Sequence, residues 1–358
     1  MNDESDSAEV VDLRSDNEAP AAPEIMAAIE RANRGPAAAY GQDAISARTR
    51  DLFCDLFETD VAVFPVLTGT AANALCIAQI APPFGSVFCH PHAHLNTDEC
   101  GAPEFFSAGA KLMGVAGEHA RIDPGALREA IEGTDDLDVH QCKSAGLSLS
   151  QSTELGTVYP VAQLAQLSAL AHDAGLRVHM DGARLANAIA SAGCSPAEMT
   201  WRAGIDMLSF GATKNGALAA EAILVFDRDL ADGLERRRKR AGHLLSKMRY
   251  VAAQLEAYVA DGLWLRLAQR ANRAAGALAA GLARVPGVEI PHPVEANEIF
   301  ARMPRALAEG LAKEGVAFLR WPGAPDLYRL VAAWCTSDAA VARVLACAER
   351  VARAHARM

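Results

Sequence analysis

Short apolar runs alternate with segments of helical periodicity along the first two thirds of the chain, and this alternation restricts the fold more than any other feature. A helix between consecutive strands returns the chain across a sheet, so such strands lie mostly parallel. The pattern therefore predicts an α/β fold whose sheet has seven strands, at residues 61–66, 86–90, 111–115, 146–151, 176–180, 205–210 and 221–226. Helices are predicted between them, at residues 70–80, 124–131, 161–174 and 184–192.

The sequence changes in character after Asp227. Segments rich in Ala, Arg and Leu predict two long helices, at residues 228–260 and 264–285, separated at Gly262. Strands predicted at 297–303 and 328–334, followed by a last helix from Asp338, indicate a smaller α+β region. We expect an N-terminal segment (1–20, its first eight residues disordered), a large domain (21–245) and a small C-terminal domain (246–358).

Composition and charge argue against several classes of protein. At 358 residues, 51% of them hydrophobic, the chain can bury a full core. The net charge is −10 and the one basic cluster, residues 236–240, is interpreted as a solvated helix face, so we expect no nucleic-acid partner. No apolar run reaches the roughly 18 residues that a membrane-spanning helix needs, and the acidic start does not resemble a leader. Eight cysteines without a CxxC pair are typical of reduced thiols, so we expect a soluble protein of the cytoplasm.

One lysine stands at the end of a predicted strand. Lys214 lies in the segment SFGATKNG, among small residues and with no acidic residue adjacent. A nucleophilic amine that forms an imine with an aldehyde needs space for its partner and a lowered pKa, and this segment offers the space. Taken alone, a lysine in such a segment is more often a surface residue.

Asp181 ends another apolar run, at the carboxyl edge of the predicted sheet, where ligands bind in such folds. A buried carboxylate there needs a cationic partner. A protonated pyridine nitrogen would supply one, and Asp181 would keep that ring protonated so that it accepts electrons. The alternative interpretation is an N-cap for the helix that follows Gly182.

The turn from residue 67 to residue 74 joins a predicted strand to a helix through small residues. Free backbone N–H groups and the helix dipole favour a phosphate at such a turn, and the hydroxyls of Thr68 and Thr70 beside Gly69 would assist. The turn matches neither a Walker A loop nor GxGxxG, so it does not indicate a nucleotide.

Three histidines alternate in His90-Pro91-His92-Ala93-His94, a pattern that suggests a metal site. Pro91 breaks a regular strand, however, and no other set of residues repeats metal-ligand spacing, so we predict no metal. His90 and His92 are assigned surface or capping roles, and His94 is expected to lie over a planar cofactor.

A phosphate cradle, a flat-lying histidine, a pyridine-facing aspartate and an imine-forming lysine, in this chain order, describe a site for pyridoxal 5′-phosphate (PLP). From about Asp12 onward the chain resembles the low-specificity L-threonine aldolase family, a group of fold type I PLP-dependent enzymes. The motifs that carry the resemblance are DLRSDN (12–17), AYGQD (39–43), TGTAANAL (68–75), HLNTDECGAPE (94–104), HMDGARLANA (179–188), SFGATKNG (209–216) and KMRY (247–250).

The resemblance implies a role for each matching residue. Lys214 would hold the cofactor as a Schiff base, and Asp181 would pair with the pyridine nitrogen. The residues expected to bind the cofactor are Thr68, Gly69, Thr70, His94, Asp181, Arg184, Lys214 and Arg249. Those expected to bind the substrate are Ser15, Tyr40, Arg184 and Arg329. Tyr40 and Arg249 resemble residues that reach a neighbouring subunit's site, which implies a homo-oligomer, a dimer at least and by analogy a tetramer formed as a dimer of dimers.

The implied reaction is retro-aldol cleavage of β-hydroxy-α-amino acids, such as threonine or phenylserine, to glycine and an aldehyde. Binding of the substrate carboxylate would turn the Cα–Cβ bond perpendicular to the cofactor ring. Many relatives carry a second catalytic histidine where this chain has Glu154, so the general base is left open between His94, acting directly or through water, and Glu154. Two alternatives remain: another PLP activity on this fold, such as β-elimination or transamination, and a non-catalytic protein that keeps the fold as a scaffold.

Overall fold

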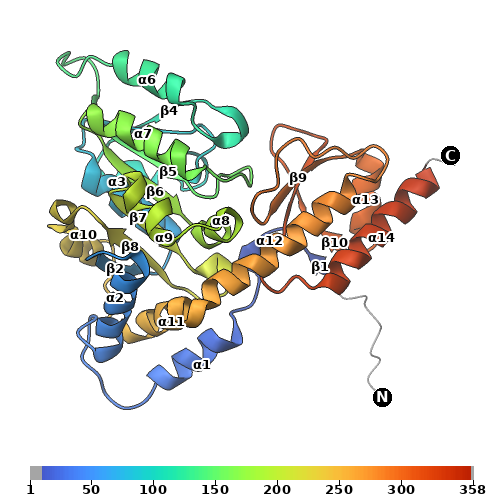
Figure 1. Cartoon of the computed structure of the whole chain (residues 1–358), viewed down its shortest axis with the longest axis horizontal. Helices are drawn as coiled ribbons and strands as arrows, with labels where there is room; N and C mark the ends of the chain where they lie inside the picture. The colour runs from blue at the N-terminus through green and yellow to red at the C-terminus, as the bar shows by residue number, and fades with distance from the viewer. Residues whose placement is uncertain (1–9, 356–358) are drawn as a thin grey trace.

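The apolar runs of the first two thirds form one seven-stranded sheet in the computed structural model, which describes residues 10–355 (Figure 1). The strand order is β2-β8-β7-β6-β5-β3-β4, and of these seven strands β8 alone runs antiparallel to its neighbours. The predicted mostly parallel sheet is confirmed, and its strands are β2 (Ala62–Val66), β3 (Gly85–Cys89), β4 (Lys111–Gly114), β5 (Lys143–Ser150), β6 (Arg177–Gly182), β7 (Met207–Gly211) and β8 (Glu221–Val225).

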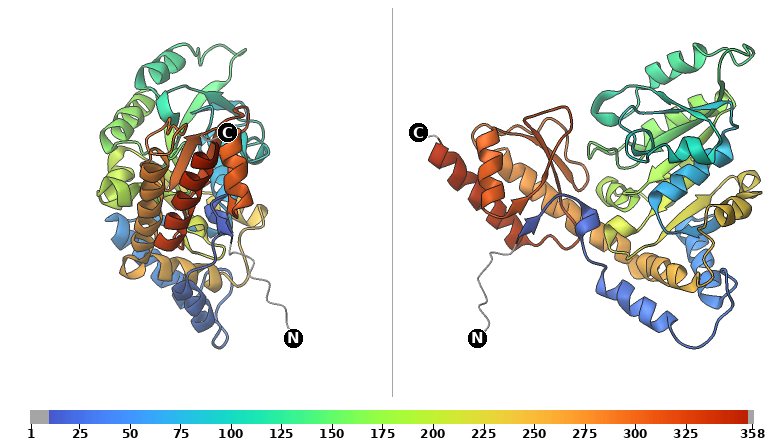
Figure 2. Two further views of the ribbon diagram at one scale, coloured as in Figure 1. Left: turned by 90° about the vertical axis from the view of Figure 1, so that its right-hand side faces the viewer. Right: turned by 180° about the vertical axis from the view of Figure 1, so that it is seen from behind.

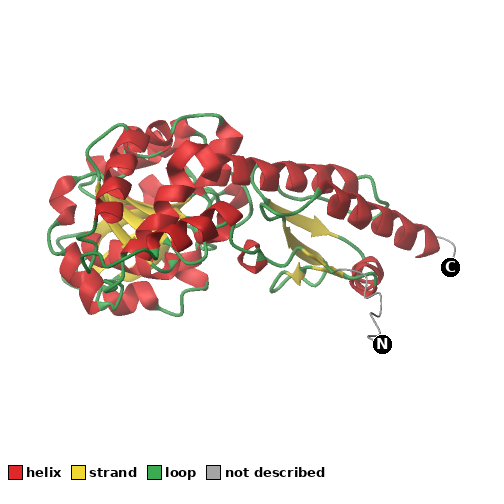
Figure 3. Ribbon diagram, turned by 90° about the horizontal axis from the view of Figure 1, so that it is seen from below, coloured by secondary structure: helices red, strands yellow, loops and turns green. Residues whose placement is uncertain are grey.

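Helices enclose this sheet, as the view from below shows (Figure 3). Strands β3, β7 and β8 are buried at every residue, which is typical of a parallel sheet covered on both faces. The predicted helices are present within a few residues of their expected ends, as α3 (Gly69–Ile80), α6 (Pro124–Glu132), α7 (Val161–Asp173) and α8 (Leu185–Ala192). Further helices are α1 (Pro23–Ala32), α2 (Ala44–Phe57), α4 (His94–Thr97), α5 (Ala102–Phe106) and α9 (Pro196–Met199). None of the helices described between residues 10 and 355 is long and apolar enough to cross a bilayer.

The prediction of one helix over residues 228–260 is wrong. The segment forms a 3₁₀ turn (Arg228–Ala231), then α10 (Leu234–Arg240), then α11 (Arg249–Val259). Gly233 and Gly242 interrupt it because both adopt left-handed backbone angles, with φ of +75° and +80°, which an α-helix cannot contain.

The basic cluster at residues 236–240 is not a uniformly solvated face. Arg238 is buried, donates hydrogen bonds to Glu235 and to the carbonyl oxygen of Pro65, and lies 5.8 Å from the ring centroid of Phe64. The other members of the cluster are exposed, so the expectation holds for them but not for Arg238.

The second, smaller unit contains an antiparallel sheet of order β11-β12-β9, covered by helices. Its strands are β9 (Glu298–Arg302), β11 (Leu319–Arg320) and β12 (Leu327–Val331), and its helices include α13 (Arg305–Lys313) and α14 (Asp338–His355). The N-terminal segment runs alongside this unit, where β1 (Val11–Asp12) pairs in parallel with β10 (Val316–Ala317) (Figure 2). The predicted first eight disordered residues lie outside the described range.

Helix α12 (Leu263–Leu282) joins the two units (Figure 1). Its first half, including Trp264 and Leu267, packs in the core of the large unit, and its second half, including Leu278 and Leu282, packs in the core of the small unit. Helix α11 contacts α1 and α2 of the large unit. The domain boundary at 245/246 stays a prediction, and this packing favours a boundary inside α12.

Candidate active site

The carboxyl ends of the parallel strands surround a cavity of about 240 Å³. Turns that follow β2, β3, β5 and β7, together with the end of β6, each place a functional side chain in its wall, as expected for a sheet of this topology. The predicted site residues that line the cavity are Thr68, Gly69, Thr70, His94, Glu154, Asp181 and Lys214.

The N-terminus of α3 forms one end of the cavity. The Thr68 hydroxyl oxygen accepts a hydrogen bond from the N–H of Ala71 at 3.1 Å and caps the helix. The N–H groups of Gly69 and Thr70, which begin the helix, have no acceptor within it. A Cβ added to Gly69 would meet no atom within 4 Å. This end therefore combines free donors with open space, as an anion requires.

A chain of hydrogen bonds crosses the floor of the cavity from His94 to Asp181. The Nδ1 atom of His94 lies 2.9 Å from Glu99 Oε1. The Asn73 amide donates to the same oxygen at 2.7 Å and to Asp181 Oδ2 at 2.9 Å. The hydrogen bond with Glu99 raises the pKa of His94, although burial acts in the opposite direction. Asn73 and Glu99 were not predicted, and we name these four residues the ring network.

Asp181 is only 4% exposed, and its other carboxylate oxygen accepts the N–H of Ala183 at 3.0 Å. The residue that caps α8 is Arg184, so Asp181 does not serve as the N-cap of that helix. No ion pair to Asp181 is formed among the described residues 10–355. A buried carboxylate without a cation is energetically costly, so this position suits a ligand that brings a positive charge.

Lys214 reaches the cavity from a 3₁₀ turn (Thr213–Asn215) after β7. Glu221 lines the same cavity and accepts the backbone N–H groups of Ala212 and Thr213, each at 3.2 Å. Burial raises the pKa of Glu221 to about 7. The antiparallel pairing of β7 with β8 sets Gly211 opposite Glu221, so an acidic group stands near the lysine although none is adjacent in sequence.

Glu154 lies in the turn after β5. Burial raises the pKa of Glu154 to about 7, and the negative charge of Glu298 adds to that rise. A carboxyl group with a pKa near neutrality can both hold and release a proton under ordinary conditions, which is what a general acid or base needs.

Beside the cavity lies a second group of charged residues, which we name the arginine cluster: Asp16, Arg184, Glu298 and Arg329. Arg184 donates two hydrogen bonds to Asp16, at 2.7 and 2.9 Å, and its Nη1 lies 3.2 Å from Glu298 Oε2. Arg329 Nη1 lies 3.7 Å from Glu298 Oε1. Burial alone would raise the pKa of Asp16, but the guanidinium of Arg184 lowers it overall.

The arginine cluster brings together residues from both ends of the chain. Ser15 stands next to Asp16, and its hydroxyl oxygen accepts the N–H of Asn17, a residue that itself lines the cavity. Arg329 Nη2 donates to the carbonyl oxygen of Arg14, 315 positions away, at 3.4 Å. Ser15, Arg184 and Arg329 are thus gathered near the cavity without lining it, and Asp16 and Glu298 were not predicted.

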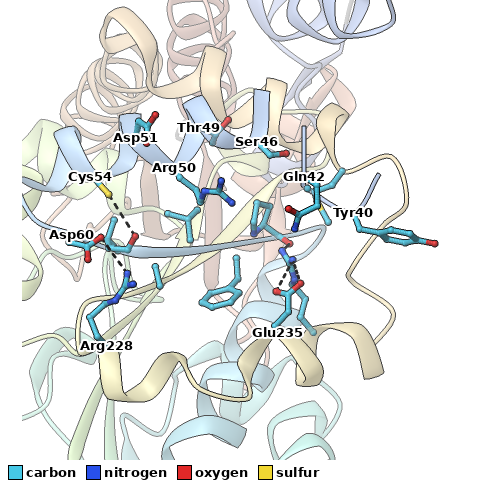
Figure 4. Close-up of a pocket in the computed structure, with 18 residues that line it drawn as sticks. Tyr40, Gln42, Ser46, Thr49, Arg50, Asp51, Cys54, Asp60, Arg228 and Glu235 are labelled. Carbon is cyan, nitrogen blue, oxygen red and sulfur yellow. Dashed lines mark hydrogen bonds and ion pairs between the residues drawn. The ribbon is translucent and has the colours of Figure 1, made fainter. Parts of the chain in front are cut away.

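Tyr40 and Arg249 lie elsewhere. Tyr40 lines a separate cavity of about 440 Å³, where its ring points away from Arg50 and Glu235 and is 46% exposed (Figure 4). Lys239 Nζ lies 4.8 Å from that ring. Arg249 donates to the carbonyl oxygen of Gly35 at 2.9 Å.

The remaining histidines have local roles. His90 Nδ1 accepts the N–H of His92 at 3.1 Å, and His90 Nε2 lies 3.2 Å from the carbonyl oxygen of Gly117, an arrangement that holds the turn after β3. Over the part of the chain that the structure describes, no group of three His, Cys, Asp or Glu side chains is arranged to hold a metal ion.

Comparisons with known proteins agree with this geometry. The sequence profile of the β-eliminating lyase family matches residues 12–306. The chain is 44% identical to a low specificity L-threonine aldolase of Pseudomonas sp. (strain NCIMB 10558) over 93% of this chain and 95% of that protein. It is 46% identical to a protein of the same name from Pseudomonas aeruginosa, over 90% of this chain and 92% of that protein. The solved structure of a Leishmania major threonine aldolase superposes with a TM-score of 0.89, covering 96% of this chain and 99% of that one at 24% identity, and so shares the fold.

Proposed function

The chain belongs to the low-specificity L-threonine aldolases, within the β-eliminating lyase family, and we propose that it cleaves β-hydroxy-α-amino acids such as L-threonine, L-allo-threonine and phenylserine to glycine and an aldehyde. The observation that supports this proposal most directly is the composition of one cavity. An amine (Lys214), a buried carboxylate without a cation (Asp181) and the N-terminus of α3 face a single space. The enzyme is accordingly a carbon–carbon lyase.

The family's cofactor is PLP, and the fold is that of fold type I PLP enzymes. The residues present fit this group. The open space over Gly69 suits its phosphate, and Asp181 lacks the cation that a pyridine nitrogen supplies. When bound, PLP supplies the electron sink that bond cleavage at Cα requires.

Each wall residue then has a task. Lys214 would be the covalent attachment point, and Asp181 would keep the ring nitrogen protonated. Thr68 and the N–H groups of Gly69 and Thr70 would bind the phosphate. His94, whose Nδ1 lies 2.9 Å from Glu99, would contact the ring.

The substrate carboxylate binds at the arginine cluster. Asp16 makes no contact with Arg329 or with Nη1 of Arg184, and the neighbour of both is Glu298. Ser15 lies next to Asp16 in sequence, and these groups would contact the carboxylate. Contact at this end orients the amino acid so that the Cα–Cβ bond is the one that breaks. The β-hydroxyl proton passes to His94 or to Glu154, two groups in the cavity wall that can accept it near neutral pH.

The test is an assay of the purified protein, supplied with PLP, on L-threonine, L-allo-threonine and phenylserine. We expect glycine and aldehyde in equal amounts. Ammonia with a keto acid would instead indicate β-elimination, and amino transfer to an added keto acid would indicate transamination. A protein that binds PLP without turnover of any of these substrates would be a scaffold, which contradicts the proposal.

We also propose a homo-oligomer, a dimer at least and by analogy a tetramer. Tyr40 and Arg249 lie outside the cavity of their own chain, which is what residues that complete a neighbour's site would do. Light scattering of the purified protein measures its mass, and a monomer that is fully active at high dilution would contradict this assignment. We place the protein in the cytoplasm, which is supported by eight cysteines that are all free.

A further inference from the structure

The arginine cluster is nearly balanced in charge before any substrate binds. The fork of Arg184, its Nε and Nη2, is taken by Asp16, and Glu298 stands between the Nη1 atoms of Arg184 and Arg329. One buried arginine, Arg184, and one partly exposed arginine, Arg329, thus already face two buried carboxylates. Glu298 is 0% exposed, so its charge cannot be compensated by water.

Hydrogen bonding at this cluster is incomplete. Both carboxylate oxygens of Glu298 are buried without a hydrogen-bond partner, and so is Nε of Arg329. Arg329 Nη1 lies 3.7 Å from Glu298, beyond hydrogen-bond distance. By contrast, Asp16 receives two hydrogen bonds from Arg184 and a third from Asn297 at 3.0 Å. The contacts of Glu298, and not those of Asp16, are therefore the ones that can change when a further group binds.

Glu298 also adjoins the turn that carries Glu154. A Cβ added to Gly156 would lie 2.7 Å from the backbone oxygen of Glu298, so the turn after β5 lies directly against the start of β9. The N–H groups of Glu295 and Ala296 donate to the carbonyl oxygen of Gly156. The two carboxyl groups interact electrostatically, since the charge of Glu298 raises the pKa of Glu154.

An incoming substrate carboxylate disturbs this balance. It adds a negative charge next to Glu298, where the described arginines already have carboxylate partners. Burying an additional uncompensated charge costs several kcal/mol, whereas protonation of one carboxyl group removes the excess.

We propose that Glu298 is a positioning residue that holds Arg184 and Arg329 in the free enzyme, and that the Glu154–Glu298 pair takes up one proton from solvent when an amino acid's carboxylate binds. The inference rests on the proposed function, because it requires the carboxylate to bind at the arginine cluster. In the bound state the pair carries one negative charge instead of two. The charge of the substrate carboxylate replaces the one that the pair has lost.

The charged groups that face this pair come from several elements. The cations are Arg184 at the start of α8, Arg329 on β12, Lys214 after β7 and, when protonated, His94. The anions are Asp16 before α1 and Asp181 on β6. Arg184 and Arg329 already have carboxylate neighbours, so a carboxyl group of the pair is a proton site that can offset the added charge, and the raised pKa of Glu154 places that site near neutral pH.

The experiment is calorimetric titration of the PLP-loaded enzyme with glycine, which binds without cleavage, at pH 8 in buffers of different ionisation enthalpy. The dependence of the heat on the buffer gives the number of protons taken up. Proton changes at the amine and at the cofactor are common to all variants, so differences between variants report on the carboxyl pair. Wild type should take up about 0.5 to 1 proton more than Glu298→Gln, and its glycine affinity should fall more steeply with rising pH.

Two further variants keep the test decisive. Glu154→Gln removes the other member and should lose the same proton, which provides the result if Glu298→Gln fails to fold. Asp326→Asn is the matched control, because Asp326 is a carboxylate that pairs with Arg302 at the far end of β9, exposed to solvent. It should leave the proton count unchanged.

Equal proton counts in wild type, Glu298→Gln and Glu154→Gln would overturn the inference. The same result with intact threonine cleavage would leave the proposed function standing. A wild-type protein that neither binds glycine nor cleaves threonine would refute the proposed function itself.

Discussion

The ring network and the arginine cluster lie side by side but differ in how their side chains are joined. In the ring network, three hydrogen bonds of 2.7 to 2.9 Å link His94, Glu99, Asn73 and Asp181, all within the large unit. In the arginine cluster, Asp16 accepts three hydrogen bonds, but neither carboxylate oxygen of Glu298 accepts any. Buried polar atoms without partners occur in both regions: Oδ1 of Asn73 and Oε2 of Glu99 in the ring network, and both oxygens of Glu298 and Nε of Arg329 in the arginine cluster. The arginine cluster also draws its members from the N-terminal segment, α8, β9 and β12.

The difference fits the proposed roles of the two regions, in which the ring network holds the cofactor and the arginine cluster binds the substrate. A fixed network suits a cofactor that stays in place through many turnovers, because preorganised groups need no rearrangement during the reaction. A cluster whose Glu298 makes no hydrogen bond suits a substrate that arrives and leaves, because the contacts of its arginines can be exchanged when the substrate carboxylate binds. Four substitutions test this comparison.

Replacement of Lys214 should have the largest effect, because the proposed reaction requires the covalent link between this lysine and the cofactor. Lys214→Ala is expected to lower kcat/KM by on the order of 10⁴-fold and to remove the visible absorption of the lysine-bound cofactor. The matched control is Lys111→Ala, an exposed lysine at the start of β4. Full activity together with retained absorption in Lys214→Ala would refute the whole assignment of the site.

Asp181→Asn tests the ring network. Loss of one partner of a buried charge pair should weaken cofactor binding by about 2 to 5 kcal/mol, and the bond-breaking step should slow as well. Titration of the apoenzyme with PLP measures the first effect, and single-turnover kinetics measure the second. Asp98→Asn, an exposed carboxylate near His94 in sequence, should change neither. Unchanged PLP affinity would show that Asp181 has only a structural role.

Arg329→Lys tests the arginine cluster. A lysine keeps the charge but cannot form two parallel hydrogen bonds to a carboxylate, so kcat/KM should fall by roughly 10- to 100-fold. Both KM and kcat should change, because this contact also sets the angle of the breaking bond. The cofactor absorption should remain. If the cofactor is lost while cleavage per bound cofactor stays normal, the two regions are not separate and Arg329 is structural.

Glu99→Gln should have the smallest effect, a shift in pH dependence. Glu99 raises the pKa of His94. If neutral His94 is the base, activity should therefore be lost, as the pH falls, at a higher pH than for a histidine without this partner. The substitution should therefore move the acid limb of kcat/KM to lower pH. An acid limb that does not move would assign the base to Glu154.

The raised pKa of His94 also affects the stability of the fold. A raised histidine pKa stabilises the folded state fully below the unfolded value of 6.5, and this contribution disappears as pH rises through the folded value. Glu99→Gln should thus destabilise the protein more at pH 5 than at pH 9, which thermal unfolding at the two pH values measures.

The sequence predicted those parts of the fold and the site that depend on local pattern. Lys214, Asp181 and the Thr68–Thr70 turn each follow an apolar run, so their place at the carboxyl edge of the sheet could be inferred from strand ends alone. The breaks before and after α10 were missed because a glycine inside a helical pattern is usually tolerated, and only the observed φ angles of Gly233 and Gly242 reveal the turns.

The partners of the site residues could not be predicted in the same way. Asn73 meets Glu99 across 26 positions and Asp181 across 108, and Arg184 meets Asp16 across 168. No local pattern encodes contacts of that range. One signal was available: Asn73 is a polar residue between the apolar pairs Ala71-Ala72 and Ala74-Leu75 of α3, and a buried amide needs hydrogen-bond partners.

The long helix α12 gives the molecule a mechanical property of its own. Its 20 residues span about 30 Å, and each half is anchored in a different core. Melting of either core would strip one half of this helix of the packing that stabilises it, and short isolated helices are marginal in water. We therefore expect unfolding of the small unit to destabilise the large one, so that the two cores melt in one cooperative transition.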